Sequence, residues 1–367
     1  MTLITEVNKE PEFGILTKGW KMRMTGRERF CRLIRKEKAD RIGFWMGDPI
    51  TETRKIYMQK TGARSALELS VSMGDDFRWI APDYKCWAGQ NPMFDVLGGE
   101  PRVSLSQPGM FADCEDPEEI EAYENMPDPE HVDLDRLEAL LDEAHASGMA
   151  TASGMWSCFF HVVADFFGME NYFMKMYTDP EVVEALTARV VDFYLAANER
   201  IFRRLGNKID VFFMGNDLGT QRDLLISPEC YRRFIKPYQK KLIDQAKSFS
   251  LPVMVHSCGA IGRIIPDLLE LGIDALHPLQ AQASGMDAGS LRQYRGKLLF
   301  VGGVDTQQLL PNADPETVRT EVLRLHEAFG DFWIASPSHE GILPNIPLEN
   351  ISAIREAAEL LGKEGNV

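Results

Sequence analysis

The chain has 367 residues, of which 44% are hydrophobic, enough to bury a large core. Its formal charge of −15 argues against nucleic acid as a partner, because binding to phosphates needs an excess of lysine and arginine. No apolar run approaches the roughly 20 residues that cross a bilayer. The sequence therefore predicts a protein that binds neither nucleic acid nor a membrane.

The beginning of the chain and the cysteines predict a cytoplasmic location. Residues 1–20 mix charged and apolar side chains, which is not typical of a secretory signal. The six cysteines are widely spaced and form no CxxC pair, so we expect free thiols rather than a disulfide framework.

Short apolar runs that end in small or polar residues predict a series of strands. In chain order they cover residues 41–48, 149–154, 210–217, 252–259, 274–280, 298–305 and 332–339. Nearly continuous apolar strands that alternate with helices indicate a parallel sheet covered by those helices.

Helix starts are marked by an acid or serine followed by Pro-Glu. An N-cap oxygen, a proline that needs no hydrogen-bond partner and an acid in the first turn all favour the start of a helix. We expect Pro237 to kink or split the helix that begins near Pro228. Residues 314–330 carry an apolar stripe at helical spacing. The predicted caps are Asp116, Asp128, Asp179, Ser227 and Asp314, and the stripe is Val318, Val322, Leu325 and Phe329.

The number of strands predicts the fold. Seven strands with helices between them, and no GxGxxG motif after the first strand, favour an α/β (β/α)₈ barrel over a doubly wound sheet. We expect a single domain over residues 1–367. Its additions are an N-terminal extension of about residues 1–22 and an acidic, turn-rich excursion around 101–130.

Several predicted strands end in polar side chains, where a barrel of this kind carries its chemistry. Because strand side chains alternate, His256 and Cys258 share one face and suit a zinc ion. His339, after the last strand, would complete a three-ligand site with one open position, as in catalytic zinc centres. The alternative is a tight strand end with a buried thiol and a hydrogen-bonded imidazole.

Further polar and aromatic residues near the strand ends are candidates for substrate binding. Asp217 and Asp305 each have an alternative role as the cap of the following helix. The aromatic cluster after the second predicted strand would line a pocket for an aromatic substrate, or would belong to the core. The expected substrate-binding residues are Asp48, Met155, Trp156, Phe159, Gln221 and Asp305.

The second half of the chain resembles the uroporphyrinogen decarboxylase superfamily, which includes cobalamin-dependent methyltransferases. The matching stretches are NDLGTQRDLLISPECYRRFIKPYQKKLID, VHSCGAIGRIIPDLLELGIDALHPLQ, SGMDAGSLRQYRGKLLFVGGVDTQQLLP and ASPSHEGILPNIPLENISAI. The stretch MTGRERFCRLIRKEKADRIGF resembles the opening helix and first strand of that family. The resemblance implies a (β/α)₈ barrel.

The decarboxylase branch of this superfamily fits less well. Its members carry an Arg-Gln-Ala-Gly-Arg stretch after the first strand, whose arginines bind substrate carboxylates. Here the same place reads MGDPITETRKIY, with only Arg54 nearby. The decarboxylase substrate has four acetate side chains, and several cationic residues are needed to bind them. Asp75 or Asp76 is a candidate for the position of the decarboxylase's catalytic aspartate.

The methyltransferase branch holds zinc with His-x-Cys and a distant cysteine. His256 and Cys258 match the first part, whereas the third position reads SPSHEG and offers His339. Glu340 is a rival for that position. Imidazole is an acceptable zinc ligand, so the resemblance still implies a zinc site.

The resemblance implies a zinc-dependent methyltransferase. It would move a methyl group from a small donor, such as a methoxylated aromatic compound, to the cobalt of cobalamin on a separate corrinoid protein, because the chain has no DxHxxG motif. Asp217 and Glu340 are the expected catalytic residues, as proton donor or ligand orienter. The alternatives are a uroporphyrinogen decarboxylase-type enzyme and a non-catalytic barrel that binds a corrinoid or tetrapyrrole.

Overall fold

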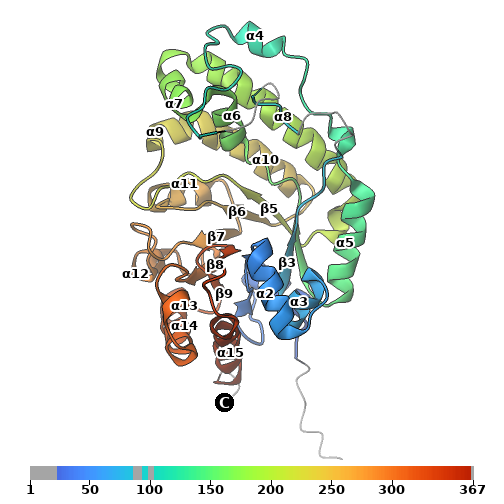
Figure 1. Cartoon of the computed structure of the whole chain (residues 1–367), viewed down its shortest axis with the longest axis vertical. Coiled ribbons are helices and arrows are strands. Elements are labelled where there is room, and N and C mark those ends of the chain that lie inside the picture. Colours follow the sequence, from blue (N-terminus) through green and yellow to red (C-terminus); the bar gives the residue numbers. More distant parts are fainter. Residues whose placement is uncertain (1–22, 86–92, 98–102, 365–367) are drawn as a thin grey trace, which may run out of the picture.

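A computed structural model describes residues 23–85, 93–97 and 103–364 of the chain. Eight parallel strands form one curled sheet in the order β1-β9-β8-β7-β6-β5-β4-β3, with helices around it (Figure 1). This confirms the predicted (β/α)₈ architecture. The strands are β1 (Gly43–Phe44), β3 (Phe77–Ile80), β4 (Ala150–Ser153), β5 (Val211–Gly215), β6 (Val253–His256), β7 (Ala275–Leu279), β8 (Leu299–Val304) and β9 (Trp333–Pro337).

The helices fill the segments between the strands. The longest described one, α8, has 26 residues, and none in the described ranges is long and apolar enough to cross a membrane. The main helices are α1 (Gly26–Ile34), α2 (Thr51–Thr61), α3 (Ala66–Met73), α4 (Pro117–Glu121), α5 (Leu134–Ala146), α6 (Phe159–Phe167), α7 (Met169–Thr178), α8 (Pro180–Leu205), α9 (Pro228–Cys230), α10 (Lys236–Ser248), α11 (Ile265–Glu270), α12 (Ala288–Leu291), α13 (Leu309–Asn312), α14 (Pro315–Phe329) and α15 (Leu348–Glu364).

Most of the predicted helix caps are present. The side chains of Asp116, Ser227 and Asp314 each accept a backbone N–H of the following turn, and Asp128 caps a single 3₁₀ turn. Asp179 is the exception, because its carboxylate accepts the Thr178 hydroxyl at 2.6 Å and makes no cap hydrogen bond. The prediction of a side-chain cap there was wrong.

The predictions for Pro237 and for the apolar stripe are confirmed. The helix that begins at Pro228 is split into α9, one wider π-helical turn (Tyr231–Ile235) and α10, with Pro237 near the start of α10. The four stripe residues of α14 are buried against the core. Five cysteines are free thiols, as expected, whereas Cys86 and residues 1–22 lie outside the described residues.

The barrel encloses its own apolar cluster, separate from the cluster between strands and helices. Phe77, Val211, Phe213, Met254 and Ile334 belong to the enclosed cluster and are almost completely buried. Because side chains fill the interior, polar groups that face a substrate have room only at the ends of the strands.

Two aspartates join the edge strands β1 and β3. The Asp76 N–H donates to the Phe44 carbonyl at 3.0 Å, and the Asp76 carboxylate accepts the Phe44 N–H at 2.8 Å. The neighbouring Asp75 accepts the Met46 N–H at 2.7 Å. Both aspartates precede β3 and so lie at the amino end of the sheet. Their suggested catalytic role is therefore wrong, because catalytic groups lie at the carboxyl end.

Candidate active site

Side chains from three strand ends meet at the carboxyl end of the barrel. His256 is the last residue of β6, Cys258 follows it by two residues, and Asp217 follows the end of β5 by two. His339 and Glu340 lie between β9 and the short strand β10 (Gly341–Ile342). β10 pairs with β2 (Asp48–Pro49), which fixes this last loop beside the end of β1. The predicted catalytic and metal-binding residues thus come together.

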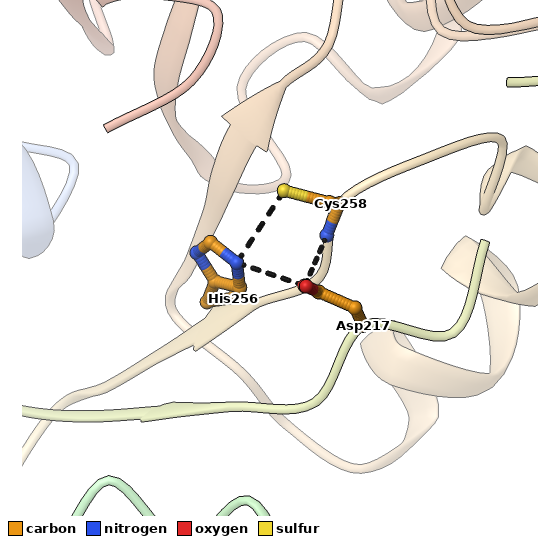
Figure 2. A group of neighbouring side chains, drawn as sticks. All are labelled: Asp217, His256 and Cys258. Atoms are coloured by element: carbon orange, nitrogen blue, oxygen red, sulfur yellow. Dashed lines mark hydrogen bonds and ion pairs between the residues drawn. The ribbon is translucent and has the colours of Figure 1, made fainter. Parts of the chain in front are cut away.

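His256, Cys258 and Asp217 form a compact triad (Figure 2). The His256 Nε2 atom lies 3.0 Å from Asp217 Oδ1 and 3.6 Å from Cys258 Sγ. The Cys258 N–H donates to the same Asp217 oxygen at 2.9 Å. One ligand atom from each residue lies within 4.8 Å of the others. A nitrogen, a sulfur and an oxygen at this spacing are a donor set that fits zinc.

Glu340 adds a carboxylate to the same site. Its Oε2 atom is buried without a hydrogen-bond partner, and lies 3.9 Å from His256 Nδ1 and 3.7 Å from His339 Nδ1. Glu340 also forms a possible ligand group with Cys258 and His339. A buried carboxylate oxygen without a donor is costly, so this atom fits a site that receives a cation.

His339 lies beside the triad in a more open position. Its side chain is 41% exposed, and its Nδ1 accepts the Gly341 N–H at 2.9 Å. A neutral imidazole whose Nδ1 accepts a hydrogen bond carries its proton on Nε2, which leaves no free lone pair. His339 must therefore give up the Gly341 contact before it can bind a metal, whereas Glu340 Oε2 has no hydrogen bond to give up.

The local charges are dominated by two carboxylates. Burial raises the pKa of the Cys258 thiol far above its usual range, and the charges of Asp217 and Glu340 raise it further. Burial also acts to raise the pKa of Asp217, but the hydrogen bond and charge of His256 outweigh it and hold that pKa below its ordinary value. A thiol in such surroundings becomes a thiolate only beside a cation, as a bound metal would be.

The sequence analysis missed His277. It lies in β7 directly opposite His256 in β6, and the two Nδ1 atoms are 2.9 Å apart. Burial lowers the pKa of His277 well below its usual value, so this ring is neutral. The sequence held one signal for this pair, because two successive predicted strands, 252–259 and 274–280, each contain a histidine.

Trp156 is at the mouth of the barrel, as expected for a substrate-binding residue. Its ring lies edge-on to His256, with ring centroids 5.0 Å apart, and 4.7 Å from the ring of Trp79 in β3. A Cβ atom at Gly215 would come within 2.3 Å of Trp156, so only glycine fits below it. Trp79, which the sequence analysis also missed, has a buried Nε1 without a hydrogen-bond partner.

Met155 and Phe159 face away from the mouth. Both belong to the cluster between strands and helices, and the Phe159 side chain is fully buried beside Tyr238 of α10. The core alternative thus holds for these two residues, and they do not contact a substrate in this arrangement. Sequence spacing could not separate them from Trp156, because the turn after β4 sends neighbouring side chains to different layers.

The three polar candidates for substrate binding differ in their surroundings. Asp48 donates its N–H to the Glu340 carbonyl at 2.7 Å, and its exposed carboxylate pairs with Arg54. Gln221 is exposed in the loop after Asp217. The Asp305 carboxylate accepts hydrogen bonds from the backbone N–H groups of Gln307, Gln308 and Leu309. Asp305 therefore caps the following helical turn, which was the alternative to substrate binding. Asp48 and Gln221 thus lie at the surface, where Arg54 and Gln307 are their respective partners.

A family comparison agrees with this geometry. The model of the family described as Uroporphyrinogen decarboxylase (URO-D) matches residues 103–360. The chain belongs to the uroporphyrinogen decarboxylase family. The match includes every residue of the triad together with His277, His339 and Glu340.

Relatives within the family have two different activities. The chain is 27% identical over 201 residues to the methylated-thiol–coenzyme M methyltransferase of Methanosarcina mazei, covering 54% of this chain and 50% of that protein. It is 23% identical over 191 residues to the methylcobamide:CoM methyltransferase of the same organism, covering 52% of each. A uroporphyrinogen decarboxylase from a Geobacter species is 26% identical over 179 residues, covering 47% and 48%. The chain spans about half the length of these relatives.

A solved structure supports the fold. A methyltransferase from Methanosarcina mazei superposes with a TM-score of 0.65 over 92% of this chain and 99% of its own, at 17% sequence identity. At this identity the likeness establishes the uroporphyrinogen decarboxylase-like barrel and nothing about the substrate.

The site of this family member is poor in cations. Among the described residues, no lysine or arginine forms a hydrogen bond or ion pair with the triad, His277, His339 or Glu340. Arg54 is near the mouth, but it pairs with Asp48 at 2.7 Å. A substrate with several carboxylates would meet acidic groups here without the guanidinium pairs that such a substrate needs.

Proposed function

We propose that the protein is a zinc-dependent methyltransferase that moves a methyl group from a small donor to the cobalt of a separate corrinoid protein. The observation that carries this proposal is the convergence of His256, Cys258 and Asp217 at the carboxyl end of the barrel, beside the unpartnered Glu340 oxygen. The names of two relatives, which include methylated thiol and methylcobamide, support the same chemistry.

His256 and Cys258 would hold the zinc ion, with Glu340 or His339 as the third ligand. When bound, zinc supplies a Lewis acid that stabilises the developing negative charge on the leaving atom of the donor. Asp217 orients the site, because one of its oxygens contacts both the His256 ring and the Cys258 N–H. We expect Asp217 to act in this way rather than as the proton donor.

Trp156 and Trp79 would bind the donor. The Trp156 ring packs against His256 and the Trp79 ring packs against Trp156, so the two partly buried rings offer an apolar wall. A methoxylated aromatic compound suits such a wall through ring stacking. A methylated thiol, by analogy with the named relative, is the other donor to test.

The choice between the two activities of the family is tested by offering both substrates to one preparation. We expect no useful decarboxylation of uroporphyrinogen, because no lysine or arginine in the described part of the chain contacts the site, and Arg54 is paired with Asp48. Product analysis by chromatography measures this, with a genuine uroporphyrinogen decarboxylase as the positive control. Turnover at ordinary enzymic rates by the metal-free protein would replace our proposal with the decarboxylase.

The third zinc ligand is tested by comparing Glu340→Gln with His339→Ala. We expect Glu340→Gln to weaken zinc binding more, because it neutralises a carboxylate whose buried Oε2 atom has no hydrogen bond, whereas the His339 Nδ1 already accepts one. Competition with a chromophoric chelator measures both dissociation constants. If His339→Ala is the weaker binder of the two, His339 takes the ligand position and Glu340 supports it.

A further inference from the structure

His277 is the closest polar neighbour of His256 inside the barrel. The two residues are in register on adjacent strands, their Nδ1 atoms are 2.9 Å apart, and their ring centroids are 5.0 Å apart. The side chain of His277 is completely buried, and its Nε2 atom has no hydrogen-bond partner. Among the described residues, its side chain hydrogen-bonds only to His256.

Aromatic rings hold His277 in place. Trp45 lies 5.4 Å and Phe213 5.5 Å from it, measured between ring centroids. Phe213 also contacts the ring of His256, at 6.3 Å. The two imidazoles are therefore packed in one aromatic compartment.

The hydrogen-bond pattern fixes the protons of both rings. Asp217 presents a carboxylate oxygen to His256 Nε2, and a carboxylate only accepts, so this nitrogen carries a proton. In a neutral His256, Nδ1 is then a bare acceptor, and His277 supplies the proton between the two Nδ1 atoms. His277 Nε2 is then left as a lone pair without a hydrogen-bond partner. The opposite arrangement would bury an unpaired N–H group.

We propose that His277 is a positioning residue that fixes the ring orientation of His256, and in the metal-free protein also its tautomer, so that His256 Nε2 points at Asp217 and Cys258. This inference rests on the proposed function only where it concerns zinc. For His256 Nε2 to bind a metal, its proton must leave that atom. The pair can shift to that arrangement without net loss of a proton, because His256 takes the proton at Nδ1 and His277 carries its own on Nε2. This leaves a buried N–H group without a partner on His277, a cost that metal coordination must offset. A supporting contact to a ligating histidine is typical of metal sites.

Three variants separate this role from packing. His277→Phe keeps a ring and removes the hydrogen bond. His277→Asn keeps a polar group near the position of Nδ1 and loses ring volume. Phe213→Leu is the matched control, because it loosens the same compartment without touching the hydrogen bond.

The first measurement is the ¹⁵N chemical shift of the histidine rings in ring-labelled, metal-free protein. We expect His256 protonated at Nε2 and His277 at Nδ1 in the wild type. The His256 pattern should persist in His277→Asn and Phe213→Leu and be lost in His277→Phe. The second measurement is zinc affinity, which should fall by about 10- to 100-fold in His277→Phe and much less in the other two variants.

The opposite tautomers in the wild type, or an unchanged His256 pattern in His277→Phe, would overturn the inference. The wild-type spectrum alone gives the first of these results, even if His277→Phe does not fold. A wild-type protein that shows the expected tautomers but binds no zinc supports the positioning role and contradicts the proposed metal chemistry. The two proposals therefore fail in different ways.

Discussion

Replacing His256 or Cys258 by alanine is expected to remove most of the zinc from a protein that otherwise holds close to one zinc ion per chain. The two side chains supply neighbouring ligand atoms, 3.6 Å apart, from one face of β6 and its extension. Loss of a ligand should weaken zinc binding more than loss of a supporting contact does, which typically lowers metal affinity by roughly 10- to 100-fold. Elemental analysis of the purified protein and chelator competition measure occupancy and affinity.

Two control variants match these changes. Cys230→Ala removes another buried thiol, whose contact is Tyr177, and His326→Ala removes a histidine that pairs with Asp331 on the surface. Both should keep full zinc occupancy, because neither residue lies near a possible ligand group. Full occupancy in the double variant His256→Ala/Cys258→Ala would show that any bound zinc lies elsewhere.

The fold could be predicted because its signals are local. A buried parallel strand is a short apolar run, and seven of the eight barrel strands have this form. The strand β3 was missed because Arg78 interrupts the run FRWI, although Phe77 is buried inside the barrel. Asp179 fitted the capping pattern, but a competing hydroxyl of the preceding residue occupies its carboxylate.

The residues of the site could be predicted from single strand ends, but the contacts between them could not. His256 and Cys258 follow from the alternation of side chains along β6. The pairing of His256 with His277 depends on the register between two strands, and the burial of the Glu340 oxygen depends on the pairing of β10 with β2. Neither register can be read from a single segment. The different directions of Trp156 and Phe159 likewise depend on the turn between them.

The proposed reaction should depend on a second protein. With this chain alone, we expect no methyl transfer from a methoxylated or methylthiol donor. Transfer should appear when a corrinoid protein with reduced cobalt is added, and should vanish in His256→Ala. The rise of the methyl-cobalt absorption band measures the reaction. Cys230→Ala, which leaves the site intact, should retain the activity.

The position of the site predicts where the corrinoid protein binds. In the proposed reaction cobalt would have to reach the site that His256 and Cys258 form, so the partner should contact the loops that follow Asp217, Cys258 and His339. Arg222 and Asp223 are exposed on the first of these loops, and charge reversal there should weaken binding. The effect should grow as salt falls, because surface attraction is least screened at low ionic strength.

The matched controls are reversals at the opposite end of the barrel. Glu37 and Lys38 are exposed between α1 and β1, which places them at the amino end of the sheet. Reversing their charges should leave partner affinity and its salt dependence nearly unchanged, because these residues lie across the packed barrel from the site. Equal effects at both ends would remove the argument for docking over His256. If no corrinoid protein from the same cell supports transfer, the methyltransferase proposal itself is wrong.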